Sequence, residues 1–244
     1  MPLRKWFRAI FLYFQPGGIS TVRLSRMLGI TYKTAWLMGH KIRHAMSTKD
    51  SLRKLTGLIR ITPGRYGRVY NPTAFRHPQE HPVLIGASLT ANGQAKYVKI
   101  KQVMSEDILI RSAGYGGLMK FIKTHAKNEA GEIISDLNRP LGERSKLLSH
   151  LGKAAFNWLN GTFRGIGPKH LQLYLDQFCC YENSRTRRQE ISNQGLAYCS
   201  EMKRITLRQL VARPALIPVT AEYDRVMRLE RSNGRSGSRG RSAS

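Results

Sequence analysis

Two amphipathic helical patterns joined through one glycine constrain the first part of this chain more than any other feature. Ser20 can cap a helix that runs to Leu28, and Gly29 ends it tightly. Thr31 can then cap the next helix, which we expect to reach about residue 46. An apolar stripe at spacings of three and four predicts a leading helix over residues 3–14. Such a set of helices is typical of a helix-turn-helix.

The helix-turn-helix interpretation assigns a role to particular side chains. In this motif the second helix enters the major groove and its first residues meet base edges, while other cations hold the phosphates. The residues predicted to meet bases are Thr31, Tyr32, Lys33 and Thr34. The residues predicted to contact phosphates are Arg23, Arg26, Lys41, Arg43 and His44. The alternative is an ordinary three-helix cap with a solvated basic face.

Acidic residues are almost absent from the same region. The first is Asp50 and the second is Glu80, and the whole chain carries 41 Lys+Arg against 15 Asp+Glu, a formal charge of +26. A charge of this size favours a polyanionic partner, and with the motif it favours double-stranded DNA. Charge alone also fits a ribosomal-type protein or a membrane-surface cation.

The composition argues against membrane insertion, secretion, disulfide bonds and zinc binding. No long uncharged apolar run is present, and Arg8 interrupts the N-terminal apolar residues, so we expect no membrane span and no signal peptide. Cys179, Cys180 and Cys199 form no CxxC pair, which argues against a disulfide framework or a zinc ribbon. Pro78 argues against a helical zinc pair at His77 and His81. The predicted location is the cytoplasm, in association with the nucleoid.

After residue 47 the pattern predicts a mixed α+β region. Residues 83–89 and 96–103 flank Asn92-Gly93 and predict a β-hairpin. The segment RITPGRYGRVYNP is interpreted as a boundary or an exposed loop. The remaining expected elements are a helical patch at 52–58, a short strand at 107–110, and helices at 118–125, 147–159 (with Trp158 facing the core) and 169–178.

These elements suggest three regions. We expect a helix-turn-helix bundle over residues 1–49 and a second domain over residues 57–185. Residues 186–244 form an arginine-rich extension, and its end, RSNGRSGSRGRSAS, has no apolar run. This extension is predicted to be disordered at least from residue 231.

Three stretches carry a resemblance to a known family. PLRKWFRAI and LSRMLGITYKTAWLMGHKIRHAM, with the later GTFRGIGPKHLQLYLDQFCCYEN, resemble segments of ISXO-like bacterial insertion-sequence transposases. SAGYGGL and GLIRI are weaker matches, and the resemblance covers roughly residues 2–185. Members of this family join a zinc ribbon, a helix-turn-helix and an RNase-H-like catalytic domain. The resemblance therefore implies that the second domain is RNase-H-like, and that the chain begins after the zinc ribbon.

The resemblance also implies DNA cleavage and strand transfer at a pair of Mg or Mn ions held by carboxylates. By position, the family's first aspartate falls at Thr62, its second at Ala113 and its Asn-type third residue at about Ala154. None of the three is acidic here, so we expect no bound metal in this copy. Glu106, Asp107 and Asp136 could substitute, but we interpret them as solvated surface acids. Arg164 stands where relatives often carry a histidine.

The sequence thus predicts a truncated, diverged transposase or transposase remnant. It is expected to bind DNA, with transposon ends as the natural targets, and to be catalytically impaired. A homo-oligomer is compatible with this interpretation. The alternatives are a metal-independent DNA-binding regulator, a basic RNA-associated protein that stacks bases on Tyr66, Tyr70 and Tyr97, and a decayed reading frame.

Overall fold

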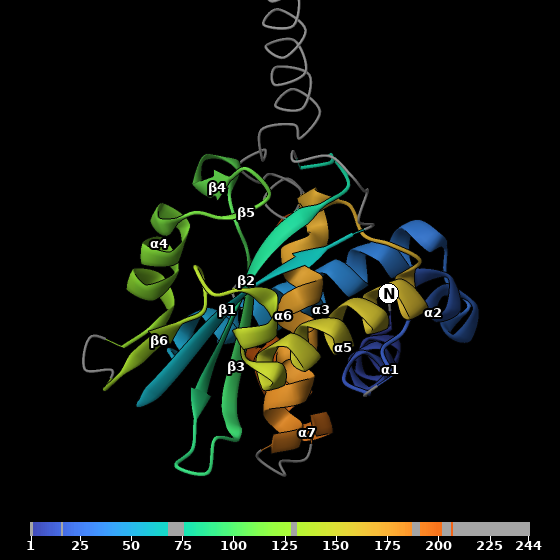
Figure 1. The fold of residues 1–244 in the computed structure, drawn as a ribbon. Coiled ribbons are helices and arrows are strands. Elements are labelled where there is room, and N and C mark those ends of the chain that lie inside the picture. The colour runs from blue at the N-terminus through green and yellow to red at the C-terminus, as the bar shows by residue number, and fades with distance from the viewer. Residues whose placement is uncertain are drawn as a thin grey trace, which may run out of the picture.

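The computed structural model of the chain describes residues 2–15, 17–67, 76–127, 131–186, 191–201 and 206. The predicted disordered tail, from residue 231, lies outside the described residues, as does Tyr70. Within the described part, no helix combines the length and apolar character that crossing a membrane requires. The fold is a mixed α+β arrangement built on one four-stranded sheet (Figure 1).

The three helices predicted at the N-terminus are confirmed. They are α1 (Leu3–Tyr13), α2 (Thr21–Leu28) and α3 (Tyr32–Leu52). Helix α3 extends past the expected end near residue 46, because it packs against α6 and its Asp50 is hydrogen-bonded to Lys99 of the strand that follows residue 94. The boundary expected at residue 49 therefore falls inside a helix.

The central sheet has the strand order β3-β2-β1-β6. Strands β2 (His81–Leu89) and β3 (Ala95–Gln102) form the predicted hairpin, with Gly93 at a φ of 73° in its turn. Strand β1 (Leu58–Tyr66) is antiparallel to β2, and β6 (Ile133–Ser135) runs parallel to β1. The sheet is mixed, as the α+β class allows.

The loop expected at RITPGRY and the helical patch expected at 52–58 are wrong. Arg60–Tyr66 belongs to β1, which pairs with β2 along its whole length, and α3 ends at Leu52. The loop was predicted because Pro63 and Gly64 are residue types typical of loops. Strand β6 pairs only with Ile59–Ile61, so Pro63 lies beyond the part of β1 that has neighbours on both sides. Pairing with distant strands outweighs local propensity here.

The remaining elements follow the prediction with shifted bounds. The expected strand at 107–110 is β4 (Ile108–Leu109), which pairs with β5 (Ser112–Ala113) after the 3₁₀ turn η1 (Ser105–Asp107). The three expected helices are α4 (Tyr115–His125), α5 (Lys146–Phe163) and α6 (Pro168–Thr186). The elements not predicted are β1, η1, β5, β6, the turn η2 (Leu141–Glu143) and α7 (Ile191–Ser200). The last of these, α7, lies in the expected extension.

Hydrophobic clusters on both faces of the sheet hold these layers together. Helices α5 and α6 pack on one face through Leu159, Leu171 and Phe178, and Trp158 joins them, as predicted. Helix α4 covers the other face (Figure 1). There Phe121 belongs to the same hydrophobic cluster as Ile59 and Ile61 of β1. A third cluster joins α1, α2 and α3 and reaches Cys180 of α6. The N-terminal helices therefore pack against α6, which itself covers one face of the sheet.

Candidate nucleic-acid interface

The turn between α2 and α3 is fixed by its own side chains. The Ser20 hydroxyl accepts a hydrogen bond from the Arg23 backbone N–H at 3.3 Å, which caps α2. Gly29 takes the left-handed conformation, with φ 56° and ψ 53°. The Thr31 hydroxyl accepts from the Thr34 N–H at 3.3 Å and caps α3. Both helix starts are thus satisfied as the sequence predicted.

The residues predicted to face DNA are mostly exposed. Arg23 and Arg26 lie exposed on α2, and Thr31, Tyr32 and Lys33 are exposed at the start of α3, while Thr34 is partly buried. Tyr32 keeps 58% of its surface accessible although it is a large aromatic residue. Together α2 and the first turn of α3 present cations and hydrogen-bonding groups to solvent.

Arg43 is an exception, because it lies inside the protein. Its side chain is fully buried, and its Nε donates to Gln177 Oε1 at 2.8 Å. The guanidinium carbon lies 3.8 Å from the centre of the Tyr174 ring, with the Tyr13 and Phe163 rings at 4.9 and 5.2 Å. The rings and the amide offset part of the cost of burying the cation, while Nη1 and Nη2 have no hydrogen-bond partner among the described residues. The predicted phosphate contact of Arg43 is therefore wrong.

Lys41 and His44 lie away from the exposed turn. Lys41 follows Tyr32 by nine residues, about two and a half helical turns, so it lies on the opposite side of α3. There it lines an apolar groove of about 370 Å³ beside Phe7 of α1 and Leu196 of α7. His44 is partly buried, with its Nδ1 3.3 Å from the Thr48 hydroxyl. Lys41 therefore does not share a surface with Tyr32 and Lys33.

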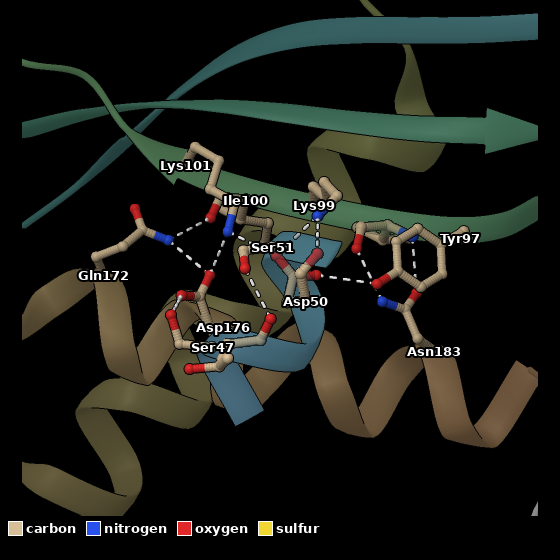
Figure 2. Close-up of polar contacts among 12 residues, drawn as sticks. Ser47, Asp50, Ser51, Tyr97, Lys99, Ile100, Lys101, Gln172, Asp176 and Asn183 are labelled. Carbon is tan, nitrogen blue, oxygen red and sulfur yellow. Dashed lines mark hydrogen bonds and ion pairs between the residues drawn. The ribbon is translucent and has the colours of Figure 1, made fainter. Parts of the chain in front are cut away.

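The second half of α3 is anchored by a buried carboxylate. Asp50 receives hydrogen bonds from the Lys99 and Lys101 Nζ atoms at 2.9 and 2.7 Å, and from the Tyr97 hydroxyl at 3.0 Å (Figure 2). Burial would raise the pKa of Asp50, but the two ammonium groups outweigh it and hold that pKa below its ordinary value. The acid is charged and paired at neutral pH.

A second acid extends this ion cluster to α6. Asp176 accepts from Lys101 Nζ at 2.6 Å and from the Ser47 hydroxyl at 2.6 Å, and Gln172 donates to it at 2.7 Å (Figure 2). Burial would lower the pKa of Lys101, but Asp176 and Asp50 raise it above its ordinary value. Lys101 thus ties α3 and α6 together at β3.

Beside the exposed turn lies a cleft of about 670 Å³. Its walls come from α2, from the first turns of α3 and from the connection between α5 and α6, and they include Arg26, Tyr32, Trp36 and Arg164. Trp36 is partly buried and its ring lies 4.0 Å from the His40 ring. Sequence reasoning assigned no role to Trp36; its place at the fifth residue of α3, one turn after Tyr32, was the available signal.

Thr62 and Asp136 meet at the sheet edge. Asp136 directly follows β6, and its Oδ2 accepts from the Thr62 hydroxyl at 2.6 Å and from the Ser145 N–H at 2.9 Å. Arg60 donates two hydrogen bonds to the same carboxylate, from Nη2 to Oδ1 at 3.0 Å and from Nε to Oδ2 at 3.2 Å. Burial would raise the pKa of Asp136, but the bonds from Arg60, Thr62 and Ser145 hold it below its ordinary value.

The interpretation of Asp136 as a solvated acid is therefore wrong, since it is fully buried. For Glu106 the same interpretation is confirmed, since that side chain is exposed and pairs with Lys120 at 3.2 Å. Asp107 also pairs with Lys120 but keeps only 15% of its side-chain surface exposed.

Glu80 was given no structural role from the sequence. It is buried and forms ion pairs with Arg65 and Arg111.

The positions that the resemblance assigned to catalysis do not form one carboxylate site. Ala113 packs with Ile59 and Ile61 on one face of the sheet, whereas Thr62, the next residue of β1, points to the other face. Ala154 is exposed on α5. Asp136 is the acid beside Thr62, and Arg60 neutralises it. Thr62, Ala113 and Ala154 carry no carboxylate and Asp136 is bonded to Arg60, so this set of side chains does not fit a pair of divalent cations. Among the described residues no group of three or more His, Cys, Asp or Glu is placed to hold a metal ion.

Of the tyrosines proposed for base stacking, the two that the structure describes, Tyr66 and Tyr97, make contacts inside the protein. Tyr66 is buried, stacks against His81 at 6.1 Å and donates to Asn160 at 3.2 Å. Tyr97 is partly buried and donates to Asp50. Burial and Arg76 lower the pKa of His81 to about 4, so this ring is neutral at pH 7.

Comparison with known proteins finds no matching protein-family model, no matching curated protein and no matching solved structure.

Proposed function

We propose that this chain is a transposase-derived protein that binds double-stranded DNA through α2 and the first turn of α3, acting as a helix-turn-helix. The observation that carries the proposal is the joint exposure of Arg23, Arg26, Tyr32 and Lys33 beside a capped glycine turn. Such a surface offers phosphate contacts from two helices and base contacts from one helix start. The net charge of +26 adds a long-range attraction to DNA.

Strand transfer is not part of the proposed activity. A mixed sheet with helices on both faces is compatible with the RNase-H-like domain that the resemblance implies. Two-metal chemistry needs several carboxylates at one place, whereas Thr62 is neutral and Asp136 is paired with Arg60. We therefore propose DNA binding that needs no divalent cation.

The same Arg60–Asp136 pair favours the second candidate, a metal-independent DNA-binding regulator. A regulator would use the sheet domain as a scaffold or for dimerisation. The two candidates differ in target, because a transposase remnant keeps the ends of its own element as its site, whereas a regulator binds an operator with two half-sites about one helical turn apart.

Fluorescence anisotropy on duplexes tests the proposal. The duplexes would come from the DNA flanking the gene and from shuffled versions of it, over a salt series with and without EDTA. We expect the flanking duplex to bind at least about tenfold tighter, about 1.4 kcal/mol, with no effect of EDTA. Equal binding of both duplexes with a steep salt dependence would leave bulk charge as the sole cause.

A charge-matched pair of double variants locates the interface. Arg23→Ala with Lys33→Ala removes two cations from the proposed surface, and Lys123→Ala with Lys153→Ala removes two exposed cations from α4 and α5. The first double variant should lose more affinity at every salt concentration. Equal losses would contradict the assignment to α2 and α3.

A further inference from the structure

The cleft beside Tyr32 has the size and lining of a small-molecule site. Its volume of about 670 Å³ falls within the roughly 300–1,000 Å³ that such sites occupy. A double helix is too wide to enter a cleft of this volume, but a single nucleotide is not. Because Tyr32 lines the cleft and also lies on the proposed DNA-binding surface, the cleft opens where bound DNA would pass.

The chemistry of the walls is aromatic and cationic. Trp36, Tyr32 and Tyr174 supply ring surfaces, Arg26 and Arg164 supply permanent positive charge, and none of the residues lining the cleft is acidic. Aromatic rings stack bases of any sequence, and arginine binds phosphate oxygens in pairs. The ligand that uses both kinds of group is a base joined to a phosphate.

Arg164 holds its place in a conformation that arginine rarely adopts. It ends α5 with φ 56° and ψ 34°, in the left-handed region, and its N–H donates to Asn160 O at 3.0 Å. Glycine takes this conformation at helix ends without steric strain. A glycine would therefore serve the helix end better, so the strained arginine points to a role for the side chain in the cleft.

We propose that this cleft holds one unstacked nucleotide of the bound DNA, with the base against Trp36 and Tyr32 and a phosphate held by Arg164 and Arg26. The proposal rests on the DNA binding proposed above and adds to it a nucleotide-binding site. Extruding a base costs stacking and pairing energy, so the site favours DNA in which a nucleotide is already unpaired.

The test compares two sets of duplexes of about 20 base pairs. One set is fully paired, and the other carries one extra unpaired 2-aminopurine nucleotide at successive positions. We expect the wild-type protein to bind the best bulged duplex about tenfold tighter than the paired one and to change the 2-aminopurine fluorescence on binding. Trp36→Leu should abolish the fluorescence change.

Arg164→Gly separates a binding role from a folding role. Glycine relieves the strained backbone, so this variant should melt no lower than the wild type while it loses the preference for the bulged duplex. Lys169→Ala is the control, since Lys169 is an exposed cation of α6 that does not line the cleft. It should keep that preference.

Each result decides between the proposals. If the paired duplex binds and no bulge position is preferred, the cleft proposal is overturned while the DNA-binding proposal stands. If neither duplex binds, the proposed function fails first. Free deoxyadenosine monophosphate serves as competitor: if it binds at micromolar concentrations and Arg164→Gly abolishes that binding without affecting bulged DNA, the cleft serves a free nucleotide and the proposal is likewise overturned.

Discussion

The two ends of α3 carry similar residues in opposite environments. At its start Tyr32 and Lys33 are exposed, whereas further along Arg43 is buried among aromatic rings and Asp50 is buried between two lysines. All four are polar or aromatic side chains in one basic segment. Their surroundings, and not their residue types, decide which of them can meet DNA.

The buried end of α3 fixes the orientation of its exposed end, where DNA binding is proposed. Helix α3 has 21 residues and is therefore about 30 Å long. Its first turn projects to solvent, and the Asp50 cluster sets the direction of its axis against β3 and α6. A helix held at one end presents its other end in a fixed orientation, which lowers the entropic cost of contacting a groove.

The largest expected effect comes from breaking the anchored end. Asp50→Asn removes the acid that Lys99 and Lys101 share and leaves buried ammonium charge behind. We expect the free energy of unfolding to fall by about 3–5 kcal/mol in urea titrations at pH 7. Glu106→Gln is the control, because its ion pair is exposed, and it should change little.

At low pH the free energies of unfolding of the wild type and of Asp50→Asn should become more similar. Because the pKa of Asp50 is lowered from 3.8, its stabilisation is fully present above that value and is lost as the pH falls through the folded-state pKa. The two unfolding curves should differ by a constant amount at pH 5–7 and converge below about pH 4. A gap that stays constant below that pH would show that the charge of Asp50 is not what stabilises the fold.

Arg43→Lys gives the next largest effect. The change keeps the positive charge but loses the planar group that lies over Tyr174 and the Nε donor to Gln177. We expect a loss of about 1–3 kcal/mol in the free energy of unfolding and an unchanged salt dependence of DNA binding. Unchanged stability with weaker DNA binding would restore the phosphate-contact role for Arg43.

A smaller effect comes from the turn that connects the two helices. Gly29→Ala meets no atom within 4 Å, so its cost comes from the φ of 56° alone and should be about 1 kcal/mol. Gly161→Ala is the matched control, since Gly161 lies inside α5 with equally open space. It should stabilise the protein by about 0.5–1 kcal/mol. Thermal melting of both variants measures the difference, and a destabilised Gly161→Ala would undermine the comparison.

Local chemistry made much of the fold predictable. The caps at Ser20 and Thr31 and the glycine turn fix α2 and α3 through contacts within three residues. The Asn92-Gly93 dipeptide likewise fixes the hairpin. Each of these signals is contained in a short window of sequence, and periodicity extends it along a helix.

The misjudged residues depend on distant partners. Asp136 is buried because Arg60, 76 residues earlier, lies on the strand next to it. Arg43 is buried because Tyr174 covers it from α6. Strand β6 is only three residues long and becomes a strand by pairing with β1. A single sequence contains no local signal for such pairings, so charge and turn composition led to surface assignments.

Lys33→Ala should have the smallest effect on stability and still change binding. Lys33 is exposed on the first turn of α3 and the structure gives it no ion pair among the described residues, so the free energy of unfolding should move by less than about 0.5 kcal/mol. If Lys33 contacts a phosphate, the variant releases one counterion fewer when it binds DNA. The negative slope of log K against log salt should then become shallower by about 0.9. Lys153→Ala, an equal change of charge on α5, should leave that slope nearly as it is. Equal slopes for both variants would mean that the exposed end of α3 attracts DNA no more than any other basic surface of the protein, and the contrast between the two ends of the helix would then concern folding alone.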